Sequence, residues 1–199
     1  MLAPTPPVSS FRRIADWFSR LTFRQAVWLA PVALAIHEVE EWNIQTWFKQ
    51  HFEDPGYFSL MTRESLWLGL GLSVVVGVAW IALACVPRNQ KLVAYLSLPF
   101  VMNVGAFPGV AQHVFFLFSF NAYAPGVITA LAVQVPVTAF LAAKAMRDRL
   151  VPWWYLALCV GIGLPPFLSI IQSGNHVAPH LQRAHLMATR IAGLVLGAP

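Results

Sequence analysis

Charge is what this sequence has least of. Only 11% of its 199 residues are Asp, Glu, Lys or Arg, whereas a soluble domain carries about 25%. Apolar residues make up 58%, and the mean hydropathy is +0.63. So few charges cannot cover a water-facing surface, which excludes an ordinary soluble domain. The composition therefore predicts an integral membrane protein, with lipid as the solvent over most of the chain.

Other absences narrow the class further. Cysteine occurs only as Cys85 and Cys159, both within apolar runs, where we expect buried small side chains and no disulfide. Residues 1–10 are rich in proline and serine and lack an early apolar core, so we expect a disordered N-terminus and no cleavable signal peptide. No linker, repeat or low-complexity run divides residues 11–199, which we interpret as a single transmembrane helical domain.

The net charge of +5 has a membrane explanation. In proteins that bind nucleic acid, Lys and Arg cluster on one exposed face. Here they occupy the short gaps between apolar runs, where they set membrane topology. We therefore expect membrane lipid as a partner and no nucleic acid.

Five stretches are long and apolar enough, or nearly so, to cross a bilayer, which takes about 20 residues. They lie at about 25–47, 65–86, 92–119, 125–143 and 153–172. A sixth piece, at about 181–198, is short and holds charged residues, so a last span, a re-entrant piece and an interfacial helix remain open. The predicted fold is an all-α polytopic membrane helix bundle of five to six transmembrane helices.

The flanking charges predict the orientation of this bundle. Arginines precede the first span, and the gaps at 87–91 and 144–149 are basic, whereas the gaps at 48–64 and 120–124 carry no net positive charge. By the positive-inside rule the N-terminus faces the cytoplasm, in a plasma (inner) membrane. Residues 11–23 carry apolar side chains at helical spacing, which indicates an N-terminal amphipathic helix on the membrane surface. A cytosolic extension of the first span remains the alternative.

His37, Glu40 and Glu41 form the most distinctive motif. On a helix, positions i+3 and i+4 share a face with position i, so both glutamates flank the imidazole, while Glu38 points sideways. An ionised carboxylate at a bilayer centre costs about 2.5–3.5 kcal/mol by insertion scales, and the next basic residue is Lys49. The cluster therefore needs protonation, a metal ion or partners from other helices. The alternative is that it caps the outer end of the helix and faces water.

His113 is the second candidate. It follows Asn103 on the third span, and Pro108 between them should kink or break that span. A broken membrane helix is tolerated where it lines a cavity. The predicted topology brings His113 to the level of His37, with Asn103 nearer the bilayer centre. We therefore expect His113 to share a site with the carboxylates, although a lone membrane histidine is often a packing residue.

Two further features lie on the same outer side. His176 and His180 are four residues apart, a spacing that places two imidazoles on one metal if the segment is helical. Pro179 opposes a helix there, so a hydrated loop remains an equal alternative. Tyr123 should lie at the outer interface, where tyrosine is common.

These residues resemble a known family. His37, Glu40 and Glu41 match the signature of the HXXEE membrane protein family, and His113 followed ten residues later by Tyr123-Ala-Pro-Gly and then Val-Ile-Thr-Ala resembles its second conserved block. The family has an asparagine four residues before that histidine, where this chain has Gly109. The family is largely uncharacterised, so the resemblance implies a conserved polar membrane site and no particular reaction.

The leading functional prediction is a membrane-embedded enzyme with a divalent metal ion. Histidine and carboxylate ligands suit Zn, Fe or Mn. The candidate ligands are His37, Glu40, Glu41 and His113, completed by His176 and His180, and the glutamate that does not bind the metal would act as a base or proton carrier. The substrate would be a lipophilic small molecule, transformed by hydrolysis or oxidation.

Two alternatives remain open. Glu40 and Glu41 without a metal would form an acid–base pair in a lipid isomerase or hydrolase. A small transporter or proton-coupled carrier would also use membrane carboxylates and a broken helix. Against the carrier, the sequence has no visible inverted repeat, although a homo-oligomer would supply one.

Overall fold

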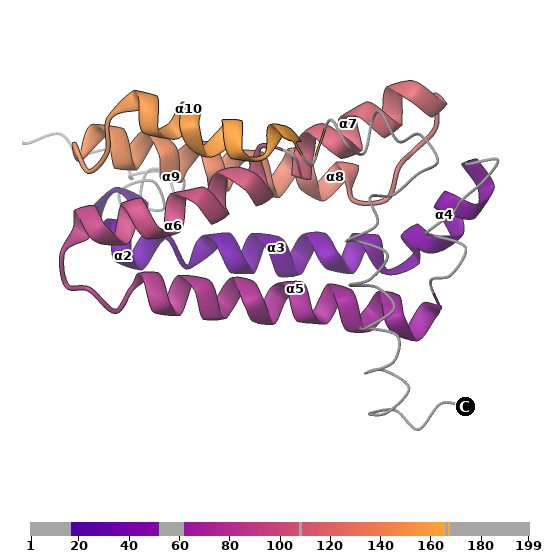
Figure 1. The fold of residues 1–199 in the computed structure, drawn as a ribbon, viewed down its shortest axis with the longest axis horizontal. Helices are drawn as coiled ribbons and strands as arrows, with labels where there is room; N and C mark the ends of the chain where they lie inside the picture. The colour runs from indigo at the N-terminus through magenta and orange to yellow at the C-terminus, as the bar shows by residue number, and fades with distance from the viewer. Residues whose placement is uncertain (1–16, 52–61, 108, 166, 168–199) are drawn as a thin grey trace, which may run out of the picture.

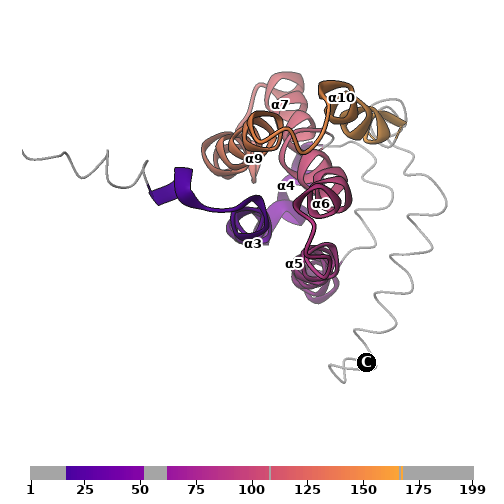
Figure 2. The same ribbon diagram turned by 90° about the vertical axis from the view of Figure 1, so that its left-hand side faces the viewer.

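A computed structural model describes residues 17–51, 62–107, 109–165 and 167 (Figure 1). In this part of the chain the regular elements are all helical, which confirms the predicted all-α class. They are α2 (Phe23–Ala26), α3 (Leu29–Glu40), the 3₁₀ turn η1 (Glu41–Asn43), α4 (Ile44–His51), α5 (Arg63–Ala84), α6 (Gln90–Gly105), α7 (Gly109–Phe120), α8 (Val127–Thr129), the π-helical turn η3 (Ala130–Gln134), α9 (Val135–Arg147) and α10 (Trp153–Ile162). The long helices run side by side along one axis, as the end view shows (Figure 2).

Three helical segments are long and apolar enough to cross a membrane. They are Arg63–Ala84, Gln90–Phe118 and Val127–Arg147, while Trp153–Ile162 is apolar but shorter. The predicted first span is divided among α2, α3, η1 and α4, and α3 itself has only 12 residues. A total of five or six spans therefore stays a prediction. Of the predicted amphipathic helix at 11–23, the first six residues lie outside the described residues, and so does the whole of the sixth piece at 181–198.

Helix α5 has the surface expected of a lipid-facing span. Thr62 and Ser65 form a capping box that starts it, and one face packs against α3 and α6. Its other face leaves large apolar side chains uncovered, including Val75 at 63% and Leu83 at 70% exposure. A continuous apolar face of this kind is unfavourable in water but not in hydrocarbon.

Helix α6 lies in the middle of the bundle, where it contacts α3, α5, α9 and α10. Pro99 inside α6 has no N–H, so the carbonyl of Tyr95 one turn earlier lacks its usual helical donor. The Tyr155 hydroxyl from α10 donates to that carbonyl at 2.6 Å. The proline is thus accommodated by a hydrogen bond that also joins α10 to α6.

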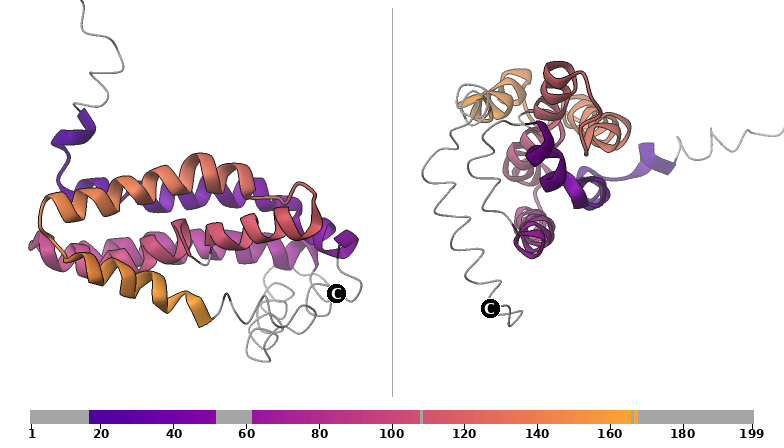
Figure 3. Two further views of the ribbon diagram at one scale, coloured as in Figure 1. Left: turned by 90° about the horizontal axis from the view of Figure 1, so that it is seen from above. Right: turned by 90° about the vertical axis from the view of Figure 1, so that its right-hand side faces the viewer.

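The predicted break in the third span is confirmed. Helix α6 ends at Gly105 and α7 begins at Gly109, on either side of Pro108. At Gly105 the chain passes so close to α9 that a Cβ would lie 1.7 Å from the Thr138 hydroxyl oxygen, so only glycine fits there. From this break α7 continues towards α8, seen from above in Figure 3, and carries His113 into the bundle.

Basic residues lie at the end of the bundle that is farther from α4 and α8 (Figure 1). The Arg24 backbone N–H donates to the Gln90 side chain at 3.0 Å, which ties the start of α2 to the start of α6. At the end of α9, buried Lys144 forms a 3.0 Å ion pair with Asp148. Partial burial raises the pKa of Asp148, but the hydrogen bond and charge of Lys144 outweigh it, so the net pKa lies below the usual value.

Candidate metal centre

Two histidines and one glutamate from separate parts of the chain meet at the end of α3. His37 comes from α3, Glu41 begins η1, and His113 comes from α7. The Glu41 Oε1 atom lies 3.0 Å from His113 Nε2 and 3.6 Å from His37 Nε2. The imidazole rings meet edge to face with centroids 4.8 Å apart. One ligand atom from each side chain lies within 4.8 Å of the other two.

Local helix geometry explains why His37 and Glu41 lie together. The Glu41 backbone N–H still donates to the His37 carbonyl as α3 gives way to the 3₁₀ turn. The i and i+4 side chains therefore stay on one face, as the sequence spacing predicts. His37 is 5% exposed and His113 4%, so the site lies inside the protein.

Glu40 points away from this cluster and binds the start of α8. Its carboxylate accepts hydrogen bonds from the backbone N–H of Ile128 at 3.2 Å and of Thr129 at 2.7 Å. The N-cap of helix α8 is Gly126, which has no side chain to cap the helix. A carboxylate at a helix N-terminus satisfies free N–H groups and interacts favourably with the helix dipole. Glu40 thus holds α8 against α3.

Thr129 connects Glu40 to His37. Its hydroxyl donates to Glu40 Oε2 at 2.5 Å and lies 3.0 Å from His37 Nδ1. Because the hydroxyl proton goes to the carboxylate, the hydroxyl oxygen must accept from the imidazole, so His37 carries its proton on Nδ1. This leaves the Nε2 lone pair facing Glu41. Hydrogen bonds of this kind orient metal-binding histidines in other proteins.

Tyr123 supports Glu40 from the loop before α8. Its hydroxyl donates to Glu40 Oε1 at 2.5 Å. Burial, followed by the hydrogen bond and negative charge of Glu40, raises the pKa of Tyr123 to about 12. The phenol therefore remains protonated, and remains a donor, at any physiological pH.

Gly126 lies directly against the three clustered side chains. Its φ of +93° is one that L side chains rarely adopt. A Cβ there would lie 2.6 Å from His113 Cε1, 2.8 Å from His37 Cε1 and 3.0 Å from Glu41 Oε1. The glycine therefore serves both the turn and the close approach of the backbone to the imidazoles.

A cavity of about 500 Å³ opens beside the cluster. His37, Glu41 and His113 line it together with apolar side chains and Asn103. The Asn103 amide donates to the carbonyls of Pro99 and Cys159, which links α6 to α10. Asn103 thus lines the same cavity as the clustered histidines and is held in place by both helices.

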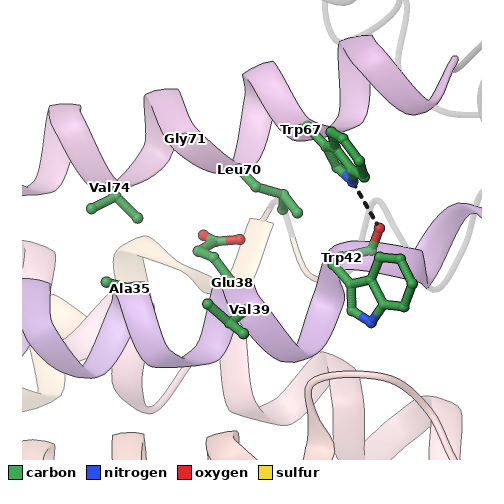
Figure 4. A pocket seen from close by; sticks show the side chains of 8 residues that line it. All are labelled: Ala35, Glu38, Val39, Trp42, Trp67, Leu70, Gly71 and Val74. Atoms are coloured by element: carbon green, nitrogen blue, oxygen red, sulfur yellow. Dashed lines mark hydrogen bonds between the residues drawn. The ribbon is translucent and has the colours of Figure 1, made fainter.

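Glu38 occupies the wall between this cavity and a groove on the outside of α3 and α5 (Figure 4). We expected it to point sideways, and it does face the outer groove, but it lines the inner cavity as well. One carboxylate oxygen accepts from the Ser73 hydroxyl at 2.5 Å, and the other is buried without a protein partner. The groove itself is otherwise lined by apolar or aromatic residues such as Val39, Trp67 and Val74.

The cluster fits a divalent metal ion. Two imidazoles and one carboxylate are the protein ligands of catalytic zinc sites that leave a position for water or substrate. The same three ligands suit non-haem iron. Closed structural zinc sites need four protein ligands, whereas three are grouped in the part of the chain that the structure describes.

The predicted site residues divide into three groups. The structure brings together His37, Glu41 and His113, and it places Asn103 on the same cavity. Glu40 and Tyr123 pair with each other and support the cluster from outside. His176 and His180 lie outside the described residues.

Sequence reasoning missed the supporting roles of Thr129, Gly126 and Ser73, and it did not single out Gln134. Thr129 and Glu40 are 89 residues apart, so no local spacing connects them. A usable signal was present in Pro125-Gly126 before an apolar helix, because a helix that starts at glycine leaves its first N–H groups in need of a carboxylate.

A comparison with known families finds a match. A family model described as a protein of unknown function with an HXXEE motif matches residues 28–141. The matched region includes α3, α7 and α8, and therefore His37, Glu41 and His113. It also includes Glu40 and the residues that bind its carboxylate, namely Tyr123, Ile128 and Thr129. No curated protein and no solved structure matches the chain.

Proposed function

The chain belongs to the HXXEE-motif family, and from that premise we propose that it is a membrane-embedded enzyme whose metal ion is held by His37, Glu41 and His113. The observation that carries the proposal is the convergence of three ligand atoms within 4.8 Å from two distant helical segments. Without a metal ion, the 3.0 Å contact between His113 and Glu41 pairs only part of this buried polar group, whereas a metal ion would pair with all three side chains at once. Zn, Fe or Mn suits these ligands.

A bound metal would polarise a substrate group or lower the pKa of a bound water, and both effects suit hydrolysis. If the metal is iron, it would instead supply oxidation chemistry. The protein would contribute orientation. Thr129 fixes the His37 tautomer, and Glu40 fixes Thr129. Glu38, with one oxygen unpartnered beside the same cavity, is placed to hold or accept a proton.

We further propose that the substrate is lipophilic and arrives from the bilayer. The outer groove between α3 and α5 has a volume of about 570 Å³ and an almost entirely apolar lining. Glu38 and Leu70 line both the groove and the inner cavity. A hydrocarbon chain in the groove would therefore lie one side chain away from the cluster.

The proposed setting is a plasma (inner) membrane crossed five or six times, with the N-terminus in the cytoplasm. The proximity of Arg24 to the start of α6 and the basic end of α9 support this orientation. The cluster then lies near the outer half of the bundle.

Metal analysis tests the proposal. We expect about one metal ion per chain in detergent-purified protein, and its loss in His113→Gln and Glu41→Gln. His51→Gln and Glu64→Gln are matched controls, because His51 in α4 bonds the Trp47 carbonyl and Glu64 lies in the first turn of α5, both outside the cluster. Helical circular dichroism checks that each variant folds. Metal retained in both site variants would contradict the assignment.

A metal-free acid–base enzyme is the second candidate, favoured by the position of Glu38 and Glu41 on the wall of one cavity. Two adjacent carboxyl groups separate into an acid and a base. Active protein that contains no metal, and loses activity in Glu38→Gln, would favour this candidate. Transport of a substrate in proteoliposomes without chemical change would instead favour a carrier.

A further inference from the structure

Gln134 is a buried polar residue that the proposed chemistry does not use. It is 2% exposed and lines the inner cavity. Its Oε1 atom is buried and has no hydrogen-bond partner in the protein. Buried carbonyl oxygens are nearly always paired, so an unpaired one calls for an explanation.

The backbone gives Gln134 an unusual setting. It is the last residue of the π-helical turn η3, and Pro136 follows in the first turn of α9. Proline lacks an N–H and its ring crowds the carbonyl four residues earlier, and a π-turn accommodates such a defect by widening the helix. Turns of this type occur frequently at functional sites.

The rest of the cavity shows what kind of molecule would fit. Leu34, Phe100 and Val104 supply apolar walls. Besides Gln134, two more side chains on this cavity have a buried polar atom without a protein partner, namely Glu38 Oε2 and His113 Nδ1. The cavity is therefore mainly apolar, with a few fixed polar positions, as is typical of pockets for small molecules.

We propose that Gln134 is a specificity-determining residue, whose Oε1 accepts a hydrogen bond from a hydroxyl or other donor group on an otherwise hydrocarbon substrate. This inference rests on the proposed enzymatic function and names its substrate class as donor-bearing lipophiles such as long-chain alcohols. A site with a buried acceptor discriminates against ligands that lack the donor, because the acceptor is then left unpaired.

The test compares dodecanol with dodecyl methyl ether, which has a similar chain but no donor. Each is titrated into the protein in lipid nanodiscs, and the midpoint of thermal stabilisation is recorded as a mole fraction of lipid. We expect the wild type to bind the alcohol about tenfold more tightly. In Gln134→Leu that preference should fall to within about twofold, while Gln45→Leu, a half-buried glutamine of α4 outside the cavity lining, should keep it.

Two outcomes overturn the inference. Equal binding of alcohol and ether by the wild type would mean that water alone satisfies Gln134, and this comparison needs no folded variant. An alcohol preference that persists in folded Gln134→Leu would place the recognition elsewhere. The titration is repeated after treatment with a chelator. A preference that survives metal removal supports the role of Gln134 even if the metal site fails its own test.

Discussion

Glu40 and Glu41 are neighbours with identical side chains, yet their partners differ completely. Glu41 faces two imidazoles, whereas Glu40 is bound by two backbone N–H groups and by the hydroxyls of Thr129 and Tyr123. A carboxylate whose oxygens already accept four hydrogen bonds has little capacity left for a metal. At the scale of single residues, the structure thus separates Glu41, the proposed metal ligand, from Glu40, which positions its neighbours.

Thr129→Val tests this positioning role. Valine has nearly the same shape but removes the acceptor of the His37 Nδ1–H, so the ring loses its fixed tautomer and orientation. We expect metal affinity to fall about 10- to 100-fold, measured by competition with a chromophoric chelator. Thr46→Val, an exposed threonine of α4, is the control and should leave affinity unchanged. Equal metal affinities of the two variants would show that Thr129 does not position His37.

Gly126→Ala tests the close approach of the backbone. The added Cβ would clash with both imidazoles and would occupy a strained left-handed conformation. We expect metal binding to be lost and the melting temperature to drop. Gly69→Ala is the matched control, because its Cβ would meet no atom within 4 Å and alanine favours a helix. A Gly126→Ala protein with normal metal content would show that the glycine serves the turn alone.

At the scale of helices, two prolines shape the central span. Pro108 separates α6 from α7, while Pro99 stays within α6 because another helix satisfies the carbonyl that it leaves free. Irregular backbone inside a membrane protein is tolerated where such partners exist. The Tyr155 hydroxyl is therefore a structural link between α10 and α6.

Tyr155→Phe should weaken that link without touching the site. The Tyr95 carbonyl would remain partly buried and unpaired, which costs about 1 kcal/mol of unfolding free energy. Denaturant unfolding in detergent measures the loss, and metal content should stay normal. An unchanged unfolding midpoint would mean that lipid-side water or another group replaces the phenol.

The sequence predicted those helices and breaks whose position depends on a single local rule, such as the length of an apolar run or the presence of a proline. Apolar runs of about 20 residues located α5, the α6–α7 pair and the α8–α9 segment, and Pro108 located the break. The i, i+4 spacing predicted the His37–Glu41 pair. The sequence did not show that Glu40 and Glu41 have separate partners. The partners of Glu40 lie in and before α8, and Thr129 there is 89 residues away. The π-turn before Pro136 was also missed, because a proline within an apolar run predicts a helix defect but not its type.

At the scale of the whole molecule, the proposed orientation separates the two ends of the bundle. Single cysteines at Arg88→Cys, in the α5–α6 turn, and Ala122→Cys, between α7 and α8, would report on each end. In intact cells a membrane-impermeant maleimide should label only Ala122→Cys, because basic turns stay in the cytoplasm. The native Cys85 and Cys159 are buried and should contribute little background. Labelling of Arg88→Cys alone would show that the orientation is the opposite of the proposed one.

The metal cluster itself is tested most directly by X-ray absorption spectroscopy of the zinc-loaded protein. The account predicts a zinc shell with two imidazole nitrogens and carboxylate or water oxygens at about 2.0–2.2 Å, which does not form in His113→Ala. A zinc shell without imidazole, or one that keeps two imidazoles in His113→Ala, would contradict it.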